Sequence, residues 1–143
     1  SRRRQRQMCI RDSINAYKNA SREAVAESED PQALIMVLLD ELLRAMRAYV
    51  TIVEKQDNAK ARKNDNLTRS LTIIYGLQSC LNFEEGGEIA ENLFKLYEYS
   101  RVQLLNASTT GETVGMNAAI QAISDIREAW SMMNPDLQEQ SVV

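Results

Sequence analysis

The sequence predicts an all-α protein, an antiparallel four-helix bundle with an additional short N-terminal helix or strap. Apolar residues recur at spacings of three and four along four long segments, which is the period of an α-helix lying against a core. Five glycines and two prolines in 143 residues leave too few turns for a sandwich or barrel of short strands. Four long helices joined by short connections are typical of an antiparallel bundle.

Chain length and charge divide the sequence into three parts. We expect residues 13–135 to form a single helical-bundle domain, followed by a flexible tail at 136–143. Residues 1–12 form an arginine-rich leader that we expect to be disordered or non-native. It lacks the apolar stretch of a secretory signal, so we do not interpret it as one. Five of the 17 basic residues lie in the first eleven positions, so the chain from residue 12 onward has 12 basic against 20 acidic residues, a net charge of −8. An acidic body does not favour a nucleic-acid surface.

The first predicted helix runs from Pro31 to about Glu54. Asp30 can cap it, and proline is favoured at the first helical position. Its longest apolar run, Ala33 to Leu39, is much shorter than the roughly 20 residues that cross a membrane, so we expect no membrane insertion. Apolar residues form two neighbouring stripes on this helix: Ile35, Leu38, Leu42, Ala45, Tyr49 and Ile52, then Met36, Leu39, Leu43, Met46, Val50 and Val53. Such a helix is either central to a bundle or has an apolar face that a partner covers.

The polar segment Lys55–Asn66 is predicted to be a connection, and a second helix follows from about Leu67 to Leu81. Its inward residues are Leu67, Leu71, Ile74, Leu77 and Leu81. A third helix runs from about Gly87 to Ala107, after a turn in which Asn82 and Glu85 have the spacing of a capping box. Its predicted inward side contains Ile89, Leu93, Leu96 and Leu104, with Phe94 and Tyr97 beside them.

After a loop at Ser108–Gly111, the last helix is predicted from about Thr113 to Met133, with Pro135 just beyond it. Its inward residues are Met116, Ala119, Ile120, Ile123, Ile126, Trp130 and Met133. The segment Ser13–Glu29 has a looser helical pattern and accounts for the additional short helix or strap.

The residue types exclude most catalytic chemistry. The chain has no histidine, which removes Ser-His-Asp and Cys-His catalytic sites, and its two cysteines, Cys9 and Cys80, form no CxxC pair. Four glutamates at the start of the third helix complement the helix dipole better than they resemble a cation site. Gly86-Gly87 lacks the strand and the lysine of a phosphate-binding loop. The sequence therefore predicts no enzyme activity, no cofactor and no metal site, and a cytoplasmic location.

Four stretches, in order, resemble the FliS family of flagellin-specific export chaperones. INAYKNAS at Ile14–Ser21 resembles the family's N-terminal tyrosine motif, and EDPQALIMVLLDELLRA at Glu29–Ala45 is similar to its S-P-x-x-L-I-x-M-L-Y-D-G-A stretch. LNFEEGGEIAENLFKLYEY at Leu81–Tyr99 resembles its GGEIA-x-NL-x-x-LYDY block, and DIREAW at Asp125–Trp130 resembles its final helix. One departure is Leu39, which stands where the family has the aromatic residue of L-Y-D.

The resemblance implies a cytoplasmic chaperone that binds the disordered C-terminal segment of flagellin, prevents premature polymerisation and aids delivery to the flagellar type III export gate. In this family the segment becomes helical in hydrophobic grooves of the bundle. We expect seven residues to contribute to core and groove walls, without a division between the two roles: Leu38, Leu42, Leu71, Ile74, Leu93, Leu96 and Tyr97. The resemblance also places Ile14 and Tyr17 in the N-terminal motif that docks on an export gate protein or shields the groove when no client is bound. The alternative for Tyr17 is a structural role, in which it only holds the strap against the bundle.

Two alternatives stay open. One is a helical-bundle adaptor that binds another secreted or regulatory protein, such as an anti-sigma factor. The other is an unrelated four-helix domain whose similarity to the family is incidental. The sequence does not determine the oligomeric state, the particular flagellin or its affinity.

Overall fold

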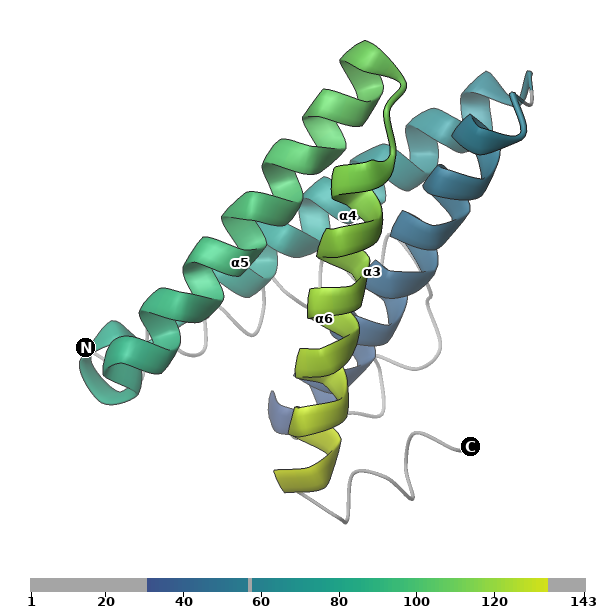
Figure 1. Cartoon of the computed structure of the whole chain (residues 1–143). Helices are drawn as coiled ribbons and strands as arrows, with labels where there is room; N and C mark the ends of the chain where they lie inside the picture. Colours follow the sequence, from purple (N-terminus) through teal and green to yellow (C-terminus); the bar gives the residue numbers. More distant parts are fainter. Residues whose placement is uncertain (1–30, 57, 134–143) are drawn as a thin grey trace.

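The computed structural model describes residues 31–56 and 58–133, which contain four α-helices and no strand (Figure 1). The helices are α3 (Pro31–Glu54), α4 (Lys60–Ser79), α5 (Phe83–Thr110) and α6 (Val114–Met133). None of the helices in these ranges is long and apolar enough to span a lipid bilayer.

The helices form an antiparallel bundle in which each one packs against two others. α3 contacts α4 and α6, and α5 also contacts α4 and α6. Short connections reverse the chain between successive helices (Figure 1). The predicted fold is thus confirmed for the described residues, whereas the predicted strap at 13–29 lies outside them.

α3 supplies more of the core than any other helix. Both of its predicted stripes are buried or nearly so, because α4 and α6 pack against two sides of it. Its buried apolar residues are Leu34, Met36, Leu38, Leu39, Leu42, Leu43, Ala45, Met46, Tyr49, Val50 and Ile52. Most of its wide apolar surface is therefore covered by other helices of the bundle.

α4 begins at Lys60, seven residues before the predicted start at Leu67. The segment Lys60–Asn66 was expected to be part of the connection because it is polar, but lysine, alanine and arginine are good helix formers. Its neighbour α3 also supports α4, since Arg69 donates a hydrogen bond to Glu41 at 3.2 Å. The true connection is therefore confined to residues 55–59.

α5 is longer than predicted at both ends. At its start, the side chain of Asn82 accepts hydrogen bonds from the backbone N–H groups of Glu84 and Glu85, both at 3.1 Å. This confirms Asn82 as the N-cap. The helix continues to Thr110, and the hydroxyls of residues 108–110 donate to carbonyls three or four residues earlier. Gly111, at φ 77° and ψ 6°, then ends it in the left-handed conformation.

Candidate partner-binding groove

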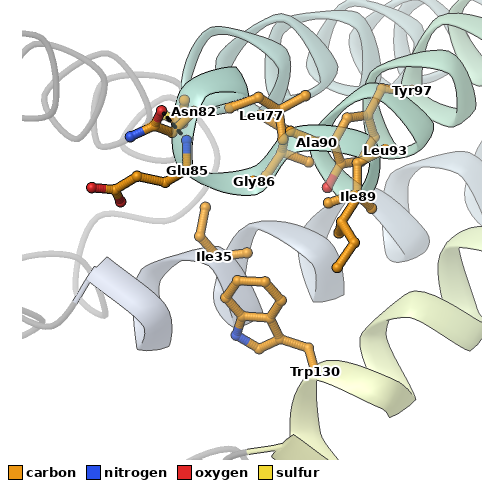
Figure 2. A pocket seen from close by; sticks show the side chains of 12 residues that line it. Ile35, Leu77, Asn82, Glu85, Gly86, Ile89, Ala90, Leu93, Tyr97 and Trp130 are labelled. Atoms are coloured by element: carbon orange, nitrogen blue, oxygen red, sulfur yellow. Dashed lines mark hydrogen bonds between the residues drawn. The ribbon is translucent and has the colours of Figure 1, made fainter.

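A groove opens at the end of the bundle where α5 begins and α6 ends. It encloses about 350 Å³. All four helices contribute to its lining: Ile35 from α3, Leu77 from α4, Leu93 and Tyr97 from α5, and Trp130 from α6 (Figure 2). Most of the lining is apolar, so the groove suits apolar side chains of a partner better than a charged ligand.

Trp130 forms the side of the groove that belongs to α6. Its indole Nε1 donates a hydrogen bond to the backbone oxygen of Gln32 at 3.2 Å, which holds the ring against the start of α3. Figure 2 shows the ring beside Ile35, with the α5 side chains across the groove. Because the hydrogen bond uses the polar edge of the indole, its carbon atoms remain to contact an apolar partner.

The α5 side of the groove has a graded exposure. Tyr97 is buried at the base, and burial raises the pKa of its phenol, with a smaller contribution from the charge of Cys80. Leu93 is half-buried and packs against the core. Ile89 is 71% exposed at the rim, so its predicted place on the inward side of α5 is wrong. A large aliphatic side chain that lines a groove yet remains exposed is a candidate partner contact.

The beginning of α5 closes one end of the groove. Asn82, Glu85 and Gly86 all line it. The acidic residues of this first turn, Glu84 and Glu85, complement the positive end of the helix dipole. No group of three or more histidine, cysteine, aspartate or glutamate side chains in the described part of the chain is arranged to hold a metal ion.

The seven residues expected to form core and groove walls separate into groups. Three of them are wholly buried in the core and present no surface to a partner in this conformation: Leu38, Leu42 and Ile74. Leu71 is partly buried against the core and Leu96 is half-buried, and neither belongs to the lining of this groove.

Only Leu93 and Tyr97 of the seven line the groove. The lining also includes residues that the sequence placed on apolar stripes of their helices without assigning them to the groove, among them Ile35, Leu77, Ile89 and Trp130. One available indication was the position of Trp130 near the end of the last helix, where neighbouring helices cover a side chain least. Ile14 and Tyr17, the residues expected to dock on the export gate, lie outside the described residues.

Comparison with known proteins gives a consistent result over most of the chain. The family described as flagellar protein FliS matches residues 13–137. The chain is 33% identical to the flagellar secretion chaperone FliS of Salmonella typhimurium over 123 residues, which are 85% of this chain and 90% of the relative. It is 29% identical to that of Vibrio cholerae over 131 residues, 89% of this chain and 92% of the relative. The chaperone FliS of Escherichia coli is 30% identical over 131 residues, covering 89% and 94%.

Proposed function

The chain belongs to the FliS family of flagellar proteins, and from this premise we propose that it is a cytoplasmic flagellar secretion chaperone that acts without catalysis. Its client is the disordered C-terminal segment of flagellin. By covering this segment the chaperone prevents premature polymerisation, and it then helps to deliver flagellin to the type III export gate.

The open apolar groove is the observation that carries this proposal. An amphipathic helix binds such a groove through apolar side chains at spacings of three, four and seven residues. A volume of about 350 Å³ is at the lower end of the range for small-ligand pockets, so it accepts anchoring side chains from one helical face rather than a whole helix. Ordering a disordered client costs conformational entropy, which keeps the affinity moderate and the complex releasable at the gate.

A titration with a synthetic peptide from the C-terminus of the host flagellin tests the proposal. Calorimetry should detect binding, and circular dichroism should show a gain in helicity beyond the sum of the two components. The absence of both would contradict the chaperone function. Binding of an anti-sigma factor in place of the flagellin peptide would instead support the adaptor alternative.

A pair of exposed aliphatic residues provides a matched test of the groove. Ile89→Gln should weaken peptide binding about tenfold or more, because burying an isoleucine side chain contributes about 1.5–3 kcal/mol. The control is Val114→Gln, at the start of α6 and so at the opposite end of the bundle, where Val114 is 82% exposed. Both variants should unfold at the wild-type temperature. Equal affinities of the two variants for the peptide would remove the groove from the proposal.

Docking on the export gate is assigned to Ile14 and Tyr17, which lie outside the described residues. Tyr17→Ala should bind the flagellin peptide with wild-type affinity but lose export of flagellin in cells. Loss of peptide binding in this variant would show that the assigned role is wrong.

A further inference from the structure

α5 is not a continuous helix. Gly87, with φ 50° and ψ −123°, interrupts it and separates the turn Phe83–Gly86 from the long segment that begins at Glu88. Residues with a β-carbon almost never adopt this combination of backbone angles, so glycine is required at position 87. We call Phe83–Gly86 the entry turn.

The break brings the entry turn unusually close to the helix that follows. In a regular helix, β-carbons four residues apart are separated by about 5–6 Å. A β-carbon built on Gly86 would lie only 2.9 Å from that of Ala90. Ala90 is itself 3% exposed. Position 86 therefore requires glycine because of the space that Ala90 occupies, and position 90 requires a small side chain for the same reason.

The entry turn is also held from its other side. Asn82 caps it, and the ring of Phe83 packs edge-on against Phe94, one turn beyond Ala90, with 6.0 Å between ring centroids. Gly86 and Ala90 both line the groove, and Figure 2 shows the entry turn at its end, next to Leu77. The position of this end wall therefore depends on the angle at which the turn leaves α5, and the backbone of Gly87 sets that angle.

We propose that Gly86, Gly87 and Ala90 are positioning residues that fix the end wall of the groove and so determine affinity for the client. The identity of the client in this inference rests on the proposed function, whereas the geometry of the end wall does not. The three residues act by placing Glu85 and Asn82 at the end of the groove and Ile89 at its rim, more than by adding contact area of their own. The requirement at Gly86 and Ala90 is for space, and the requirement at Gly87 is for its backbone angles.

The test compares Gly87 with Gly111, the positive-φ glycine that follows the end of α5. An added β-carbon meets nothing within 4 Å at Gly87 or at Gly111, so Gly87→Ala and Gly111→Ala each add backbone strain without a clash. Gly111 lies at the far end of α5 from the groove. Both variants should lower the unfolding temperature, but only Gly87→Ala should weaken binding of the flagellin peptide, by about tenfold.

Trp130 provides a second measurement that needs no client. It is the only tryptophan of the chain and lines the groove, so its fluorescence emission reports on the groove directly. Gly87→Ala should shift this emission and Gly111→Ala should not. Failure of the wild type to bind the peptide would count against the proposed function alone. Unchanged emission and wild-type affinity in Gly87→Ala would overturn the present inference.

A D-alanine at position 87, introduced by peptide ligation, keeps the inference testable even if Gly87→Ala does not fold. The mirror image of φ 50° and ψ −123° lies in the extended region, so a D-residue adopts the observed angles without strain. This variant should restore wild-type affinity and Trp130 emission. In the same way, Ala90→Gly should restore part of the affinity that Gly86→Ala loses. Absence of rescue in both cases would refute a role in positioning.

Discussion

Tyr49 lies in the second half of α3, and its replacement by phenylalanine provides a test of how the core is built. The side chain is wholly buried, and its hydroxyl has no hydrogen-bond partner among the described residues. Burial also raises the pKa of this phenol. The raised pKa and the unpaired hydroxyl have the same cause, because few groups at this site could replace water around a polar atom. Tyr49→Phe should therefore stabilise the protein.

The magnitude follows from the cost of an unsatisfied hydroxyl. Burying a polar group without a partner costs about 1–3 kcal/mol in proteins. Phenylalanine keeps the ring of Tyr49 and removes this cost, but it leaves a small void where the oxygen was, and the void offsets part of the gain. We expect a net stabilisation of about 1 kcal/mol, which corresponds to a rise of roughly 3–5 °C in Tm for a chain of this size.

Thermal and urea unfolding of three proteins measure this effect: the wild type, Tyr49→Phe and the control Tyr75→Phe. Tyr75 is 68% exposed, so its hydroxyl is available to water and its removal should change the free energy of unfolding by less than about 0.5 kcal/mol. The m-value should be unchanged in both variants. A loss of about 1 kcal/mol or more in Tyr49→Phe would refute the reasoning, because it would show that the hydroxyl is satisfied in the folded protein.

Two further predictions concern polar groups. Arg127 of α6 donates a hydrogen bond from Nε to Asp40 of α3 at 2.7 Å, and both side chains are partly exposed. A double-mutant cycle with alanine at each position should therefore give a coupling energy of about 0.2–1 kcal/mol that decreases in high salt. A coupling energy of about 3 kcal/mol would contradict this prediction. The folded-state pKa of Tyr97 is above its ordinary value of 10.0, so the unfolded chain loses the proton first and stability should fall as pH rises above about 10. In Tyr97→Phe, the free energy of unfolding in urea should fall less steeply between about pH 9 and 11. A pH dependence equal to that of the wild type would show that Tyr97 is not the group responsible.

The sequence predicted the helices better than it predicted the groove. α3 is described from Pro31, in keeping with the aspartate-proline pair in the sequence, which is a local signal for a helix start. Whether an apolar residue is buried in the core or lines a groove depends on how far two neighbouring helices diverge. The spacing of apolar residues along the sequence is the same for core and groove, so it does not distinguish them. Ile89 and Met133 follow the helical period of their segments but are 71% and 76% exposed, since none of the described helices covers these ends of α5 and α6.

The core and the proposed binding groove consist of largely different residues in this bundle. α3, packed between α4 and α6, supplies more buried apolar residues than any other helix, whereas Ile89 at the groove rim is mostly exposed and contributes little to the core. Substitutions at the rim should therefore change client affinity with little change in Tm. Leu93 is different, because it both lines the groove and packs on the core. A loss of affinity in Leu93→Ala would combine a missing contact with a loosened α5, so exposed residues such as Ile89 are the ones from which the energetics of binding can be measured.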